Sequence, residues 1–137
     1  MPRAIFVSLS HTYSQIADPS RENDALRNCT CGWWRVALAR IVDVRYVFGV
    51  FGGDIVSAYK IDVPGESWPV MPANALGAGR RYIPVNAVTV EEWGSLVGCN
   101  APEMYGAVRY GDVEVGQGNG CRVLAMDESP NEADTDP

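Results

Sequence analysis

Apolar and polar residues form their clearest pattern around the dipeptide Gly52-Gly53, which is flanked by two apolar runs. In the first run, 46–51, both faces of an extended chain carry apolar residues or glycine, which predicts a central strand covered on both sides. The second run, 55–61, places Lys60 on one face and therefore predicts a half-buried strand. Because paired glycines adopt the positive φ angles of a tight turn, this stretch predicts a β-hairpin.

Four other segments carry a strand pattern. The first is the apolar patch at 4–9. A second strand is expected at 80–88, where Pro84 predicts a sheet edge or a bulge because proline lacks an amide hydrogen. The last two, 106–115 and 121–126, flank the loop GQGNG and predict a second hairpin. This loop does not have the context of a phosphate loop, since a β-like segment follows it in place of a helix and no lysine follows.

Helical patterns are short. Residues 33–42 place apolar side chains on one helical face, which predicts an amphipathic helix. Thr89, followed by two glutamates, predicts the N-cap of a second helix that Gly98 ends. The polar stretch 11–32 predicts a long loop with one helical turn at 22–27, and loops of this length are often functional. The expected fold is α+β: a strand-dominated single domain with two or three short helices.

Charge divides the chain into two parts. The 137 residues include 17 acidic and 11 basic side chains, but the last eleven residues, 127–137, hold five of the acids and no base. This segment has no hydrophobic periodicity, so we expect an acidic disordered tail behind a single domain at 1–126. The domain is then near neutral, which excludes the strongly basic composition of a general nucleic-acid coat but allows a local basic patch.

The sequence carries no membrane or targeting signal. No apolar stretch approaches the ~20 residues of a membrane span, and the patch at 4–9 is shorter than a signal-peptide core. We therefore expect a soluble, cytoplasmic protein without a membrane partner.

The four cysteines, at 29, 31, 99 and 121, do not have the paired spacing of a zinc knuckle. We expect reduced thiols, no metal and no cofactor, and a four-thiolate zinc site built from distant loops is the alternative. A catalytic pair would need His11, the only histidine, with a nearby serine such as Ser8, Ser10 or Ser14. Neighbours within one loop do not form a catalytic triad, so no catalytic residue is predicted and an enzymatic function is not expected.

The order of these elements carries a family resemblance. An early strand, a long loop and the sequence GWWR at 32–35 precede the hairpin that contains YVFGVF and IVSAYKI. A tryptophan-containing loop around Trp68, the sequence RRY at 80–82 and a final hairpin ending in NGCRV follow. Over residues 4–126 this order resembles the small mixed β-barrels of the PUA-like superfamily, especially its EVE- and ASCH-type members.

The resemblance implies a barrel pocket that recognises a nucleobase, often a modified or flipped one, in RNA or DNA. Such a pocket needs aromatic faces for stacking and arginine for base edges and phosphates. Trp68 is the foremost candidate, because its place in a proline- and glycine-rich loop gives it little local reason to be buried. One of Trp33 and Trp34 is expected to pack in the core. The candidate nucleic-acid-binding residues are Trp33, Trp34, Arg35, Trp68, Arg80, Arg81 and Tyr82.

Two alternatives stay open. Aromatic residues and arginine are also the side chains that protein interfaces use, so the chain could be a protein–protein interaction module such as a phage or host-defence accessory protein. Two strands with a tyrosine in each, followed by arginine and glutamate, also resemble the GIY-YIG nucleases, although SAYKI stands where YIG is expected.

Overall fold

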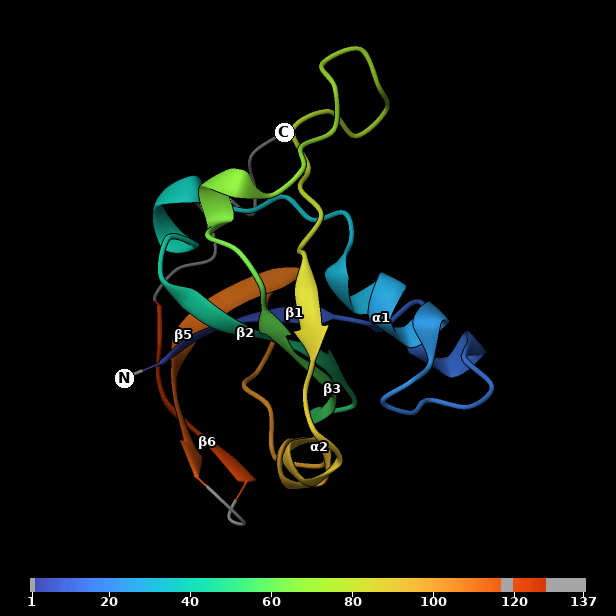
Figure 1. Cartoon of the computed structure of the whole chain (residues 1–137), viewed down its shortest axis with the longest axis vertical. Coiled ribbons are helices and arrows are strands. Elements are labelled where there is room, and N and C mark those ends of the chain that lie inside the picture. Colours follow the sequence, from blue (N-terminus) through green and yellow to red (C-terminus); the bar gives the residue numbers. More distant parts are fainter. Residues whose placement is uncertain (1, 117–119, 128–137) are drawn as a thin grey trace.

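The computed structural model describes residues 2–116 and 120–127 (Figure 1). One mixed sheet with the strand order β4-β3-β2-β1-β5-β6 dominates it, as the α+β prediction requires. β1 and β2 are parallel, and the other neighbours are antiparallel. Among the described residues the edges β4 and β6 do not pair, so the sheet is open. The strands are β1 (Arg3–Ser8), β2 (Val44–Phe51), β3 (Asp54–Ile61), β4 (Val85–Ala87), β5 (Val108–Gly116) and β6 (Gly120–Met126).

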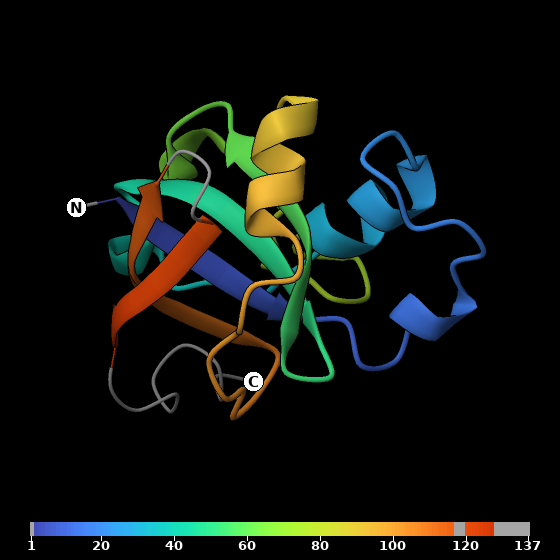
Figure 2. The ribbon, with the colours of Figure 1, turned by 90° about the horizontal axis from the view of Figure 1, so that it is seen from below.

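Two α-helices and three short 3-10 helices complete the described chain. Helix α1 (Asp24–Cys31) lies in the connection between β1 and β2, and α2 (Val90–Leu96) follows β4. Figure 2 shows the strongly twisted sheet with α2 beside β3. The 3-10 helices are η1 (Tyr13–Gln15), η2 (Leu38–Arg40) and η3 (Gly65–Ser67). No helix in the part of the chain that the structure describes is both long and apolar enough to cross a membrane.

The predicted central hairpin is confirmed. Gly52 and Gly53 have φ angles of 63° and 85°, and β2 and β3 pair on either side of them. β2 is buried on both faces: Val47 belongs to one apolar cluster and Phe48 to a second. A strand between two cores gains apolar burial on both faces, which explains the continuous apolar run.

Local capping signals account for both α-helices. The Thr89 hydroxyl accepts a hydrogen bond from the amide of Glu92, whose carboxylate accepts one from the amide of Thr89, so the predicted N-cap is confirmed. In α1, the Asn23 side chain accepts a hydrogen bond from the amide of Leu26 at 2.8 Å. α1 therefore begins inside the predicted turn at 22–27 but continues to Cys31, because Leu26, Thr30 and Cys31 are buried against the sheet.

The helix predicted at 33–42 is wrong. Only η2 is helical there, and the amide and carbonyl of Trp34 form two 2.9 Å hydrogen bonds with the backbone of Arg81. The amide of Ala37 donates to the hydroxyl of Tyr110 at 3.0 Å. These partners, distant in sequence, replace the bonds that a helix would form within the segment. The strand predicted at 80–88 is shortened to β4, which lies at the sheet edge as Pro84 indicated.

Asp127 joins the last strand to the rest of the sheet. The Arg3 guanidinium donates to both oxygens of its carboxylate, at 3.1 and 2.7 Å, and the Arg40 guanidinium lies 3.8 Å from the same group. Asp127 therefore belongs to the folded domain. The rest of the predicted tail, 128–137, lies outside the described residues, as do residues 117–119 of the loop GQGNG.

Replacing Asp127 with asparagine should lower the free energy of unfolding at pH 7 by about 1 kcal/mol, as for a partly exposed ion pair. The hydrogen bond from Arg3 lowers the pKa of Asp127, so this contribution is present above about pH 4 and disappears as the pH falls through the lowered pKa. Urea denaturation at pH 7 and at pH 3 should show the difference from the parent protein shrinking at the lower pH. Deletion of residues 128–137, the control, should leave the thermal midpoint almost unchanged. A drop of several degrees on that deletion would contradict the assignment of a tail.

Candidate binding pocket

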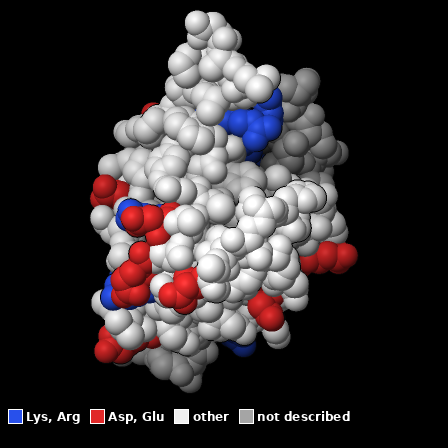
Figure 3. All heavy atoms as spheres, turned by 90° about the vertical axis from the view of Figure 1, so that its right-hand side faces the viewer, with Lys and Arg blue, Asp and Glu red and all other residues white. Residues whose placement is uncertain are grey.

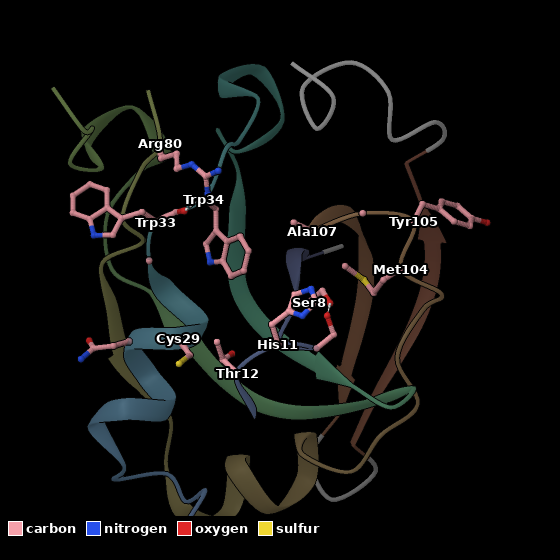
Figure 4. A pocket seen from close by; sticks show the side chains of 14 residues that line it. Ser8, His11, Thr12, Cys29, Trp33, Trp34, Arg80, Met104, Tyr105 and Ala107 are labelled. Carbon is pink, nitrogen blue, oxygen red and sulfur yellow. Dashed lines mark hydrogen bonds between the residues drawn. The ribbon is translucent and has the colours of Figure 1, made fainter. Parts of the chain in front are cut away.

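A pocket of about 880 Å³ opens beyond the carboxyl end of β1 (Figure 4). Its lining comes from 8–12 after β1, 28–34 at the end of α1, Arg80, and 104–107 before β5. The carboxyl ends of β1 and β2 lie side by side because these strands are parallel. In open α/β sheets, ligands bind outside the carboxyl ends of parallel strands, and the pocket lies at the corresponding end of the one parallel pair described in this mixed sheet.

Hydrogen bonds fix the floor of the pocket. The amide of Leu9 donates to the carbonyl of Val50, and the amide of Ser8 donates to the carbonyl of Ala107, at 2.9 and 2.8 Å. These bonds continue the pairing at the carboxyl end of β1, with β2 on one side and with the segment before β5 on the other. The exposed segment that follows, which contains His11, is thereby placed at the pocket.

Trp34 supplies an aromatic face inside the pocket. Figure 4 shows its ring directed into the cavity, with His11 and Met104 across from it. The indole Nε1 donates to the carbonyl of Thr30 at 2.9 Å, which fixes the ring by its edge. Trp34 also packs against the apolar cluster that contains Leu26. The ring is therefore held in place without covering the face that lines the pocket.

Trp33 forms the outer wall rather than the interior. It is 37% exposed, and its ring centroid lies 5.6 Å from that of Tyr82. The hydroxyl of Tyr82 donates to the Asn28 side chain at 3.2 Å. A Cβ at Gly32 would collide with the Tyr82 ring, so this position needs glycine. Trp33 and Tyr82 therefore stand beside the pocket as an aromatic pair.

Arg80 places a positive charge at the rim. Its guanidinium donates to the carbonyl of Trp33 at 3.3 Å, and Figure 4 shows the side chain lying close to Trp34. Among the residues that the structure describes, no carboxylate pairs with Arg80. A hydrogen bond to a carbonyl orients the guanidinium without neutralising it, so Arg80 can attract an anion.

The opposite rim was missed by sequence reasoning. Tyr105 is 58% exposed, and the Arg109 guanidinium lies 4.4 Å from its ring centroid. Arg109 also donates to the carbonyl of Glu103 at 2.6 Å, which fixes the loop before β5. The available signal was an aromatic residue in a loop between a helix and a strand, which is a common setting for binding residues.

The structure brings most of the predicted residues together. Trp33, Trp34 and Arg80 line the pocket, and Tyr82 packs on Trp33. Arg81 pairs with Trp34 through its backbone, while its guanidinium donates to the carbonyl of Trp68 at 3.1 Å. Arg35 is half-buried and lies outside the lining.

The expectation that Trp68 is exposed is wrong. Trp68 is 2% exposed and belongs to the apolar cluster that contains Ile41 and Val44. Its indole Nε1 donates to the carbonyl of Val63 at 2.9 Å, which satisfies the polar atom inside the core. The loop 63–69 folds back over the sheet, so Trp68 contributes to stability and is not available to stack on a base.

The imidazole of His11 is not hydrogen-bonded to the serine hydroxyls near it among the described residues. Within the described part of the chain, no side-chain hydrogen bond involves the His11 imidazole, and the hydroxyls of Ser8 and Ser10 bond to each other at 3.3 Å. Tyr59, one of the tyrosines in the nuclease alternative, is fully buried.

The cysteines lie in two separate places. Cys29 lines the pocket, while burial raises the pKa of the neighbouring Cys31 thiol to about 12. On the other side of the molecule, the amide of Cys121 donates to Cys99 Sγ at 3.2 Å, and burial raises the pKa of the Cys121 thiol to about 11. The described residues include no cluster of three or more side chains suited to hold a metal ion.

Comparison with protein-family models, with curated proteins and with solved structures finds no match to this chain.

Replacing Trp68 with alanine should lower the free energy of unfolding by about 3–5 kcal/mol, because a large buried side chain is removed. The matched variant Trp33→Ala should cost about 1 kcal/mol or less, since Trp33 is partly exposed. Chemical denaturation followed by far-UV circular dichroism measures both. Equal losses in the two variants would contradict the assignment of Trp68 to the core.

Proposed function

We propose that this chain is a non-catalytic nucleic-acid-binding module that accepts a single base, unpaired and in some ligands modified, in the pocket next to Trp34. The observation that carries the proposal is the aromatic face of Trp34 inside the pocket with the un-neutralised Arg80 at its rim. An aromatic ring with a cation beside it is suited to a base with its attached phosphate.

The size and chemistry of the pocket support a base as ligand. A volume of about 880 Å³ lies within the usual range of small-molecule sites, roughly 300–1,000 Å³. Met104 and His11 lie across from Trp34. A planar ligand between them would therefore have the indole ring on one face, and a thioether and an imidazole on the other. Asn28, Ser8 and Thr12 add polar side chains that can recognise the edge of a base.

The charge distribution supports binding that depends mainly on stacking. Figure 3 shows a basic cluster below the projecting loop, while the acidic side chains in that view lie mostly away from it, with smaller basic groups among them. A small basic cluster on a near-neutral domain gives few phosphate contacts, and the salt dependence of binding is then shallow.

The resemblance to PUA-like domains also supports this function. We propose that the curved six-stranded sheet is an open form of the PUA-like barrel, with the base pocket at the carboxyl end of its central strand. All four cysteines are free. We propose a reducing, cytoplasmic setting for the protein.

A protein–protein interaction module is the second candidate, and exposed apolar side chains favour it. Leu38 and Val42, in and after η2, are 46% and 57% exposed, and Val70 is 49% exposed. Figure 1 places η2 and the projecting loop at the same end of the molecule. The apolar side chains of Leu38, Val42 and Val70 do not line the pocket, so a protein partner could contact them beside it.

Binding of short labelled single strands, measured by fluorescence anisotropy, tests the first candidate. Trp34→Leu should weaken binding by about 1–3 kcal/mol, the value of a lost base stack, whereas Trp34→Phe should retain most of the affinity. Arg80→Ala should reduce the slope of log affinity against log salt by about 1. Arg122→Ala is the matched control, because Arg122 is exposed on β6 and pairs with Glu114.

A panel of RNA and DNA strands, with modified and unmodified bases, covers the ligand classes. If none of them binds the parent protein, the base-binding proposal is wrong. Cross-linking in a host lysate, with Leu38→Asp as the variant that should lose the cross-link, then tests the protein-partner candidate.

A further inference from the structure

A loop at residues 71–80, here called the finger, projects from the body of the protein (Figure 1). Its last residue, Arg80, lines the pocket. The base of the finger is closed by a bridge between Val70 and Arg81. Inside that bridge, the amide of Met71 donates to the carbonyl of Arg80 at 2.8 Å, and the amide of Gly79 donates to the carbonyl of Met71 at 3.3 Å. The two ends of the finger are thus held together.

Turns shape the finger itself. The amide of Ala75 donates to the carbonyl of Pro72, and the amide of Ala78 donates to the carbonyl of Ala75, at 3.0 and 3.1 Å. Gly77 and Gly79 have φ angles of 84° and 88°, which side chains with a Cβ rarely adopt. The finger is therefore folded before any partner binds, which reduces the entropy lost on binding.

The tip of the finger is apolar, and basic side chains lie where it joins the body of the protein. Leu76 is 99% exposed, and residues 70–79 contain no charged side chain. Arg80 and Arg81 follow directly. A single exposed leucine is ordinary on a protein surface, but this one stands at the end of a projecting, hydrogen-bonded loop next to the rim of a pocket.

The finger and the pocket form one unit. Arg81 is paired with Val70 of the finger base on one side and with Trp34 of the pocket on the other. Arg80, the last residue of the finger, lines the pocket and donates to the carbonyl of Trp33. Whatever the tip contacts is thus held at a fixed place relative to Trp34.

We propose that the finger is a wedge for duplex nucleic acid: Leu76 enters the base stack, Arg80 holds the adjacent phosphate, and the displaced base enters the pocket. This inference rests on the proposed function and extends it to paired strands. Proteins that open a base stack insert apolar side chains such as leucine between base steps, and cations beside the wedge grip the backbone.

Other occupants fit the finger less well. Binding to a lipid surface needs a broad apolar face, whereas the finger offers one large apolar side chain at its tip. Energetic centres of protein interfaces are enriched in tryptophan, tyrosine and arginine, and leucine is under-represented there. A single leucine at the tip, with arginines where the finger joins the protein, is better matched to the narrow gap between stacked nucleobases.

The test uses a duplex and its single strand, each carrying 2-aminopurine next to the base that is to be displaced; its fluorescence rises when it loses that stacking neighbour. The parent protein should bind both and should raise the fluorescence of the duplex. Leu76→Ala should abolish most of this rise and weaken duplex binding about tenfold, because the side chain that separates the stacked bases is removed. The affinity for the single strand should stay unchanged. Leu76→Met should restore the rise. Leu124→Ala, which alters a partly exposed leucine on β6, is the matched control.

The outcomes separate the two proposals. If the parent protein binds neither strand form, the base-binding function itself is wrong. If it binds single strands but Leu76→Ala leaves the duplex signal intact, or weakens both forms equally, the wedge is wrong and the pocket proposal stands. Single-strand binding without any duplex binding by the parent protein would also overturn the wedge.

Discussion

The backbone pairing of Trp34 with Arg81 determines how the functional surface of this protein is built. Two 2.9 Å hydrogen bonds join the segment after α1 to the segment before β4, and a third contact of the same kind, from the amide of Ile83 to the carbonyl of Cys31, continues the pairing at 2.8 Å. Cys31 and Ile83 are fully buried, so this junction is anchored in the core. Because Arg81 also pairs with Val70, the pocket wall and the finger share one anchor.

Burial below this junction explains why its geometry is fixed. Trp68 fills the core beneath Arg81 and accepts a hydrogen bond from the Arg81 guanidinium through its carbonyl. A Cβ at Gly65 would collide with the backbone and side chain of Ile41, so the loop that carries Trp68 lies tightly against the chain. Interiors packed this closely respond to small changes in volume, and a change at Trp68 is therefore transmitted toward the pocket.

The sequence reveals the parts of this fold that local interactions determine. The hairpin at Gly52-Gly53 and the capping box at Thr89 depend on residues adjacent in the chain, and both predictions are confirmed. The segment 33–37 has helical periodicity, yet its amides bond to Arg81 and Tyr110, which no local pattern can indicate. The prediction that Trp68 is exposed failed for the same reason, because residues distant in sequence bury it. The predicted residues Trp33, Trp34, Arg80 and Tyr82 do meet, but the place of Tyr105 across from them depends on the path of a loop.

The way the arginines are used shows which kind of recognition this surface can support. Arg3 and Arg40 both pair with Asp127, and Arg109 lies over the Tyr105 ring. Arg27 and Arg122 pair with neighbouring acids. These side chains hold the fold and add little to a long-range field, because their charges are paired or lie among acids. Arg80 lies at the pocket rim, and among the described residues its guanidinium donates to a carbonyl and pairs with no carboxylate. A cation next to the aromatic ring of Trp34 attracts a ligand at short range. Selectivity at such a surface must come from the shape of the pocket around Trp34, where stacking distinguishes a base that has left its helix from one that has not.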